Sequence, residues 1–543
     1  MAASPPETAG GVQAAGGDDG GADVDAALGA RLGELLVSGG DTRCVVVPST
    51  GNNAYHCPPL PVEGQIIRGS CTGSPPCATG VASAAAALRS LEAATAAAGG
   101  GDGEGEGKSS VGAYEAAFDD AMDEVRTRLG AALRLPDGSG VFLSASGTDA
   151  EFIPLAIAQQ LYPGAPIRSV LAADGETGSG GTNACSGKYF DKMVPLAGAE
   201  EGAHEREVGS TLLGLPEIEQ LRIPAREADG VIRDVNGALD EYVWGEGGGG
   251  GKSEGKGKEG APVWILRQVL GSKTGFSTDQ LSTKGRERVI EVADLCQMRK
   301  PAEVVRSSLE NGACALITGS KFFQGSAFSA ATLVPPQLME RLAASASDPA
   351  TPPLPAGLRD FFARFDVPPS LPHWRSQLGG TINEGLLLRW HTALPLLEQV
   401  YALPDGERER IEAEWTARVA QLIEGVENVE VAHSEVGIVS IALTKADGTR
   451  CGRDELRLVH RHLATDASGL LAEGGGDASL RADLATRCFI GQPVGFTSEY
   501  AVLRLAVGAE MVLDIANGSY DEATDELVLR KLDWLLRNLP ELN

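Results

Sequence analysis

The chain has 543 residues, of which 43% are hydrophobic and 22% charged, so it is long enough for two or three soluble domains. Its formal net charge of -28 disfavours partners such as nucleic acid or an anionic membrane. The nine cysteines are scattered, which argues against both a zinc site and a disulfide framework. With no apolar run of about 18 residues and no signal-peptide pattern, a cytoplasmic protein is expected.

Shifts in composition divide the chain into four segments. They are a disordered tail, an N-terminal segment, a large domain and a small C-terminal domain, and they span 1–21, 22–115, 116–345 and 346–543. Two runs that mix glycine with charged residues, 99–107 and 245–260, are interpreted as surface insertions without chemistry.

Within the large domain, short apolar runs alternate with amphipathic stretches. The predicted strands are 140–144, 167–172, 262–269, 313–318 and 330–334. The predicted helices are 149–161, 284–293 and 304–311, with a short strand leading into Asp294 as an alternative within the second of them. This alternation predicts an α/β fold with a largely parallel sheet, whose ligands lie at the carboxyl ends of its strands.

The C-terminal part has a different pattern, in which longer helices accompany short strands. The predicted helices are 382–400, 407–424, 453–465 and 522–538, and the predicted strands are 429–431, 438–443 and 502–507. Because the first two strands are close in sequence, they are expected to pair antiparallel. The pattern predicts a smaller α+β domain.

The first motif with chemical content is SASGTDA at 144–150, where a predicted strand ends and a helix begins. Free backbone amides at the helix start, with the hydroxyls of Ser146 and Thr148, can form a phosphate cradle. Gly147 lets a phosphate approach the backbone closely. The alternative is an ordinary helix start capped by Thr148 or Asp149.

Two further motifs follow along the chain. Asp294 stands at a predicted strand end, where its carboxylate can hold a protonated ring nitrogen while Gln297 donates to a ring oxygen; the alternative is a loop aspartate that caps a turn. Lys321 lies after a strand, between Ser320 and two phenylalanines. An apolar wall disfavours the ammonium form and makes a lysine a better nucleophile, whereas the alternative is a surface lysine.

Taken together, the phosphate turn, the carboxylate and the lysine occur in an order that resembles the fold-type I enzymes that use pyridoxal phosphate. The set is most similar to the branch that holds class V aminotransferases and cysteine desulfurases. The resemblance covers about 140–334 and resumes near 487–508. It implies the aspartate-aminotransferase-like fold, pyridoxal 5'-phosphate as cofactor, an amino acid or related amine as substrate, and a homodimer.

The resemblance also implies roles for individual residues. Lys321 would form the Schiff base with the cofactor, Asp294 would pair with the pyridine nitrogen, and Gln297 would contact the ring oxygen. Residues expected at the phosphate are Ser146, Gly147, Thr148, Thr318 and Ser320. Arg504, on a predicted strand of the small domain, would grip the substrate carboxylate. No metal site is expected.

The chain departs from the family pattern at two places. The stretch 172–179, where relatives stack an aromatic residue on the cofactor ring, holds none, and Tyr189 or Phe190 would have to reach in. Ile490 stands where desulfurases carry their cysteine, with Cys488 two residues earlier. A transaminase-like transferase is therefore favoured. The alternatives are a lyase, desulfurase or decarboxylase, and a non-catalytic binding protein on the same fold.

Overall fold

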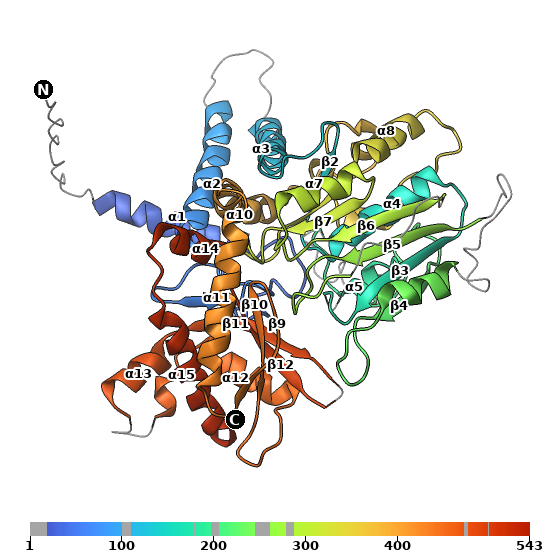
Figure 1. Ribbon diagram of the computed structural model, residues 1–543. Helices are drawn as coiled ribbons and strands as arrows, with labels where there is room; N and C mark the ends of the chain where they lie inside the picture. The colour runs from blue at the N-terminus through green and yellow to red at the C-terminus, as the bar shows by residue number, and fades with distance from the viewer. Residues whose placement is uncertain are drawn as a thin grey trace, which may run out of the picture.

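The computed structural model describes residues 19–99, 110–178, 180–196, 206–244, 261–278, 287–471, 476–497 and 499–542. Most of the predicted N-terminal tail and both glycine-rich insertions lie outside these residues, although the last three residues of the tail begin helix α1 (Asp19–Leu36) and Gly99 ends helix α2 (Ala78–Gly99). The chain forms two sheets with their own layers of helices (Figure 1). None of the described helices is both long and apolar enough to span a membrane.

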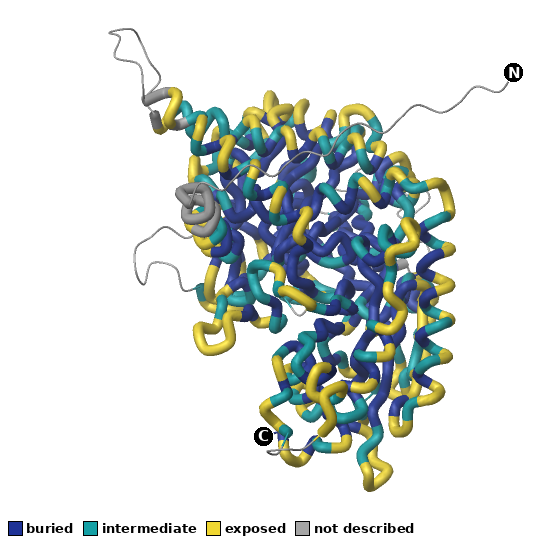
Figure 2. Tube along the Cα trace, turned by 90° about the vertical axis from the view of Figure 1, so that its left-hand side faces the viewer, coloured by how far each residue is buried: buried dark blue, intermediate teal, exposed yellow. Residues whose placement is uncertain are grey.

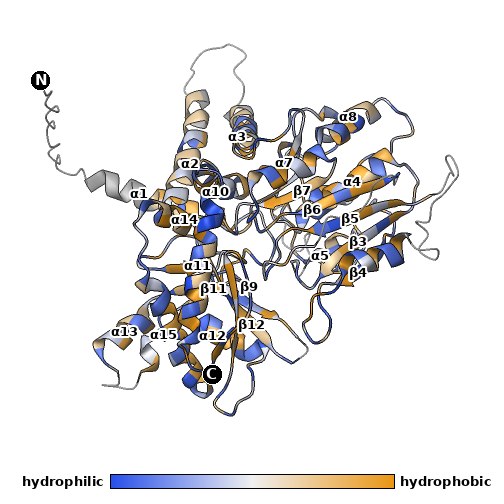
Figure 3. Cartoon of the chain, in the orientation of Figure 1, coloured by the Kyte–Doolittle hydropathy of each residue, from blue (hydrophilic) through white to orange (hydrophobic). Residues whose placement is uncertain are grey.

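The larger sheet has seven strands in the order β2-β8-β7-β6-β5-β3-β4. Its members are β2 (Gly140–Ser144), β3 (Ile167–Asp174), β4 (Glu219–Pro224), β5 (Val263–Val269), β6 (Val289–Asp294), β7 (Cys314–Thr318) and β8 (Ala330–Val334). Strand β8 pairs antiparallel with β2 and β7, and every other pairing is parallel. The predicted largely parallel α/β sheet is confirmed. Its central strands are strongly hydrophobic, as buried parallel strands are (Figure 3).

The predicted helix 284–293 is wrong in its described part. Residues from Val289 onward form strand β6, which lies between β5 and β7 and pairs parallel with both. Ile290, Val292 and Ala293 are buried in this central position. The β-branched Ile290 and Val292 and the position of β6 between two other strands favour the extended conformation. Strand preference reflects packing on a pleated sheet rather than local periodicity.

Each face of the large sheet packs against its own set of helices. Val141 and Leu143 of β2 join one core with α3 (Ser110–Ala132) and α10 (Glu384–Tyr401), whereas Phe142 joins the opposite core with α4 (Phe152–Leu161). This alternation follows from the two-residue period of a strand. Helices α7 (Ala302–Glu310) and α8 (Pro336–Ser345) complete the cover. Buried segments run through the interior, and exposed residues lie mainly on turns and outer helix faces (Figure 2).

The smaller sheet has five strands in the order β1-β11-β12-β10-β9. They are β1 (Ile66–Arg68), β9 (Val429–Glu435), β10 (Ile438–Leu443), β11 (Cys488–Gly495) and β12 (Ala501–Ala506). Around them lie α11 (Glu407–Glu424), α12 (Arg453–Leu463), α13 (Ala478–Ala485), α14 (Ala509–Asn517) and α15 (Ala523–Arg537). Strands β9 and β10 pair antiparallel as predicted. Strand β1 was not predicted; it comes from the N-terminal segment and pairs parallel with β11.

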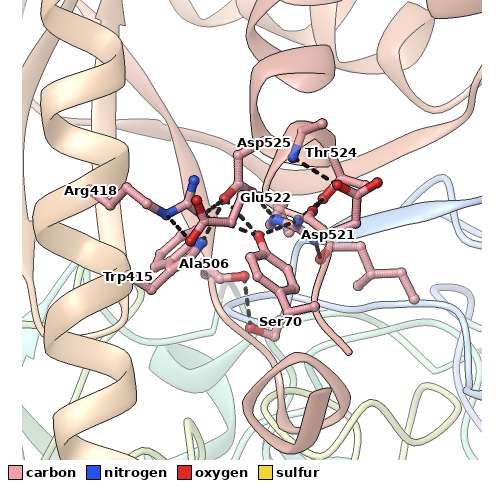
Figure 4. Close-up of polar contacts among 12 residues, drawn as sticks. Ser70, Trp415, Arg418, Ala506, Asp521, Glu522, Thr524 and Asp525 are labelled. Atoms are coloured by element: carbon pink, nitrogen blue, oxygen red, sulfur yellow. Dashed lines mark hydrogen bonds and ion pairs between the residues drawn. The ribbon is translucent and has the colours of Figure 1, made fainter. Parts of the chain in front are cut away.

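A buried polar cluster fixes strand β1 to the small domain (Figure 4). Asp525 of α15 accepts hydrogen bonds from Arg68 Nε at 2.6 Å, Trp415 Nε1 at 3.0 Å and Tyr520 Oη at 2.6 Å, and it also pairs with Arg418. Removing one partner of such a buried pair typically costs about 3–5 kcal/mol. The N-terminal segment is therefore held firmly, and the residues flanking β1 can contribute to a site.

Candidate active site

A cavity of about 400 Å³ lies at the carboxyl ends of strands β2, β3, β5, β6 and β7, where residues of β11 and β12 also line it. This is the edge at which ligands bind in open parallel sheets. The structure brings all nine predicted site residues to its wall: Ser146, Gly147, Thr148, Asp294, Gln297, Thr318, Ser320, Lys321 and Arg504. The volume falls in the range of small-molecule sites.

The turn at 144–150, which is predicted to bind phosphate, forms as a capped start of a short 3₁₀ turn that leads into α4. Ser146 Oγ accepts hydrogen bonds from the amides of Thr148 at 3.2 Å and Asp149 at 3.3 Å, so Ser146 caps the turn rather than Thr148 or Asp149. A Cβ atom at Gly147 would lie 2.8 Å from Cys296 Sγ. Glycine is therefore required for this turn to pack closely against the end of β6.

Arg43 belongs to none of the motifs described above, but it reaches the same turn from the N-terminal segment. Its Nη2 lies 3.2 Å from Ser146 Oγ and its Nη1 lies 3.4 Å from Thr148 Oγ1, while its Nε donates to Asp41 Oδ1 at 2.9 Å. The guanidinium lies 4.5 Å from the ring centre of Phe328. Burial alone would lower the pKa of Arg43, but the nearby Tyr55 and Asp41 raise it overall. A permanent cation thus faces the phosphate turn.

Asp294 and Gln297 lie side by side beyond β6. Asp294 Oδ1 accepts from the amide of Cys296 at 3.0 Å, which fixes the carboxylate at the strand end. Gln297 Nε2 donates to the carbonyl of Cys71 at 2.9 Å, so one of its two amide hydrogens remains for a ligand. Its buried Oε1 accepts no hydrogen bond from the described residues.

Lys321 lies in the turn between β7 and β8, at the cavity wall and half-buried. Thr318, the last residue of β7, donates its hydroxyl to the carbonyl of Cys296 at 2.6 Å and thereby ties the strand to its neighbour β6. The two phenylalanines after Lys321 were expected to form an apolar wall beside it, but they do not line the cavity. Phe322 and Phe323 are fully buried in the core, and the aromatic walls come from Tyr55 and Phe328.

Arg504 is fully buried in β12 and joins three parts of the structure. Its Nε and Nη2 donate to the carbonyl of Gln492 in β11 at 3.2 and 2.5 Å, and its Nη1 donates to the carbonyl of Lys273 in the large domain at 2.9 Å. These contacts use three of the five guanidinium hydrogens. One hydrogen on each Nη is left, which is the pair that a carboxylate accepts in a fork.

The segment after β3, in which the sequence has no aromatic residue at 172–179, places the carboxylate of Glu176 at the cavity wall. Glu176 accepts from Ser272 Oγ at 2.6 Å and Thr274 Oγ1 at 3.0 Å, and it pairs with Arg226 Nε at 3.3 Å. Neither Tyr189 nor Phe190 lines the cavity. The sequence could have suggested Glu176 only through its position after a predicted strand.

Cysteine chemistry is disfavoured at this site. Ile490 and Cys488, at and near the desulfurase cysteine position, are buried in the small-domain core and do not line the cavity. The cavity cysteines are Cys71 and Cys296, both buried. Burial raises the pKa of the Cys296 thiol well above its ordinary value, which suppresses the nucleophilic thiolate. Among the described residues, no cluster of His, Cys, Asp or Glu is arranged to hold a metal.

Neither a family model nor a curated protein matches the chain. Its structure is similar to 4-hydroxyphenylacetaldehyde synthase from Rhodiola rosea, with a TM-score of 0.49 and 11% identity over 95% of this chain and 98% of that one. It is also similar to a cysteine desulfurase from Escherichia coli, with a TM-score of 0.47 and 11% identity over 87% and 95%. A phosphoserine aminotransferase from Cytophaga hutchinsonii gives 0.45 and 13% over 87% and 99%. These likenesses do not indicate the reaction, which has to be argued from the residues of the cavity.

Proposed function

We propose that this chain is a pyridoxal-phosphate-dependent enzyme that acts on an α-amino acid, with Lys321 as the cofactor lysine and a transaminase-like reaction. The observation that carries the proposal is the convergence of a phosphate turn, Asp294, Lys321 and Arg504 on one cavity at the strand ends. Each belongs to a different element, so their meeting is a property of the fold rather than of local sequence.

The residues present fit the cofactor at both of its polar ends. Ser146, Thr148 and Ser320 offer hydroxyls at the cavity wall, and Arg43 adds a cation that suits a phosphate. The carboxylate of Asp294, in the same wall, matches a protonated ring nitrogen. Gln297 keeps one amide hydrogen for a ligand, and its buried oxygen has no hydrogen-bond partner among the described residues.

The roles of the protein groups follow from this placement. When bound, the cofactor supplies an electron sink for the carbanion at the substrate α-carbon. Asp294 keeps the proton on the pyridine nitrogen, and the Nζ of Lys321 accepts the proton from the α-carbon. Arg504 orients the substrate through its carboxylate. Tyr55 and Phe328, whose ring centres lie 5.5 Å apart, form an apolar part of the cavity wall.

Transamination is favoured over desulfuration because Cys488 does not line the cavity and position 490, where desulfurases carry their cysteine, is an isoleucine. The second candidate is a binding protein without turnover, and the absorbance of bound cofactor together with α-proton exchange separates the two. The two-fold symmetric homodimer that the resemblance implies is part of the proposal.

Borohydride reduction of the cofactor-loaded protein, followed by peptide mapping, is expected to place the pyridoxyl group on Lys321. Lys273 also lines the cavity and serves as an internal comparison, because both lysines meet the same reagent. Lys321→Ala should lose the label and Lys273→Met should keep it. Label on Lys273, or none on either lysine in loaded protein, would contradict the assignment.

Arg504→Lys is expected to weaken α-amino-acid binding by about ten- to a hundredfold, since a lost hydrogen bond to a charged group costs about 1.5–3 kcal/mol. Spectral titration of the loaded protein with an amino acid and with the matching amine measures the effect. The amine should bind equally to both proteins, and cofactor content should stay the same. Equal amino-acid affinity in the two proteins would place the carboxylate site elsewhere.

A further inference from the structure

Two cations at the cavity wall have no role in the function proposed above. Lys273 lies in the turn after β5, and Arg453 is the first residue of α12; both line the cavity. Neither side chain forms an ion pair or hydrogen bond with the described residues. The hydrogen bonds of Lys273 to Arg504 and Glu176 use its backbone carbonyl and amide. Both cations are thus available to a ligand.

The carboxylates of the cavity do not neutralise these cations. Glu151 is committed to the buried Arg267, whose Nε lies 2.5 Å from its Oε2, and Glu176 pairs with Arg226. Asp294 is reserved for the cofactor ring. The cavity wall around Lys273 and Arg453 therefore carries a local excess of positive charge, although the formal net charge of the chain is -28.

The surroundings of Lys273 show that its positive charge is not compensated. The pKa of Lys273 is lowered to about 8, mainly by burial and then by the nearby Arg504, Lys321 and Arg453, whereas Glu176 acts in the opposite direction. These groups come from β12, from the turn after β7, from α12 and from the segment after β3. An anion placed among them would offset the repulsion and favour the protonated lysine.

Arg453 marks the direction in which the site extends. Together with Gln492 and Pro493, it also borders a neighbouring cavity of about 820 Å³. Arg504 lies within the first cavity and Arg453 is exposed where the two cavities meet. A substrate held by Arg504 through its α-carboxylate therefore has room for a side chain that ends in a polar group near Lys273 and Arg453.

We propose that the site takes an amino acid with a second anionic group, a carboxylate or a phosphate, which Lys273 and Arg453 bind while Arg504 holds the α-carboxylate. This proposal rests on the function proposed above. It specifies the substrate class, and it assigns to the two cations a role in specificity rather than in the chemical step.

Calorimetric titration of the cofactor-loaded protein with unreactive acids tests the proposal without turnover. Succinate should bind about tenfold more tightly than propionate, because one charge-assisted contact is added. Lys273→Met and Arg453→Gln should each reduce or abolish this tenfold preference, while propionate affinity stays the same. Arg453 is exposed, so its variant tests the idea even if Lys273→Met does not fold.

Arg457→Gln is the matched control, because Arg457 lies one turn further along α12, pairs with Asp454 and does not line the first cavity. It should leave the preference unchanged. The preference should also fall as the pH is raised above neutrality, because burial lowers the pKa of Lys273 and its deprotonation removes the charge that the second anion meets. Comparing succinate with 3-phosphonopropionate shows whether the second group is a carboxylate or a phosphate.

Loaded protein that shows no preference for succinate over propionate would overturn this proposal and leave the proposed function intact. An equal loss of preference in Arg457→Gln would also overturn it, because any positive charge on α12 would then have the same effect as Arg453. By contrast, failure of the cofactor to attach to Lys321 would remove the proposed function itself. The two failures are therefore distinguished by separate measurements.

Discussion

Asp294→Asn is expected to slow exchange of the substrate α-proton by about 10²–10³-fold while the cofactor stays bound. The magnitude is that of removing one preorganised electrostatic contact from a buried reacting centre. Asparagine has the same shape and can still accept from the amide of Cys296, so the turn beyond β6 keeps its structure. What is lost is the charge that keeps the ring nitrogen protonated.

Exchange is followed by NMR in deuterated water, at equal cofactor content for wild type and variant. Asp174→Asn is the matched control: Asp174 ends β3 at the same edge of the sheet, pairs with Arg222 and does not line the cavity. It should leave exchange unchanged. Normal exchange in Asp294→Asn, or an equal loss in Asp174→Asn, would show that Asp294 does not hold the ring nitrogen.

Asp149→Asn is expected to raise the free energy of unfolding relative to wild type. This gain should be about 3 kcal/mol larger at pH 8 than at pH 5. Asp149 is fully buried, and neither of its carboxylate oxygens accepts a hydrogen bond from the described residues. Burial raises its pKa to about 7, and the nearby Asp41 contributes in the same direction.

The sign follows from the raised pKa. Between the pKa of the unfolded chain, about 4, and that of the folded protein, the folded state holds a proton that the unfolded state has released, so the stability contributed by Asp149 falls as the pH rises through this window. Urea unfolding at pH 5 and pH 8 measures the difference. Asp405→Asn, at an exposed position before α11, should change neither value. The same pH dependence in wild type and Asp149→Asn would contradict the prediction.

Much of the large domain could be predicted because buried parallel strands are short apolar runs with clear ends. The runs ending at Ser144, Val269 and Thr318 all became strands at the predicted places. Strand β6 was predicted only as an alternative to a helix because VIEVAD follows a charged stretch, and its periodicity suits a helix as well as a strand. The pairing with β5 and β7 decides between them.

Eight of the nine predicted site residues were found because they stand at or just after the ends of β2, β6 and β7, and the carboxyl ends of parallel strands meet at one edge. Arg504 lies within β12 of the small sheet and was predicted from the family resemblance alone. Arg43 could not be found in this way, and the position of Lys273 after β5 does not by itself indicate a role. Arg43 reaches the site from a segment without regular structure, through contacts with Asp41 and Ser146 that are set by the tertiary fold. Lys273 resembles any turn lysine until its neighbours Arg504 and Arg453 are known.

The position of β1 has a consequence for the order in which this protein folds. Arg68 and Asp525 are 457 residues apart in sequence, and they meet in a buried pair. The small sheet therefore cannot be completed on the ribosome until nearly the whole chain has been synthesised. Contacts of such high sequence separation form slowly, because the entropy of closing the loop is lost before the contact is gained. The residues near β1 that line the cavity, Tyr55 and Cys71, should accordingly be among the last to become ordered, so cofactor binding is expected to report the end of folding.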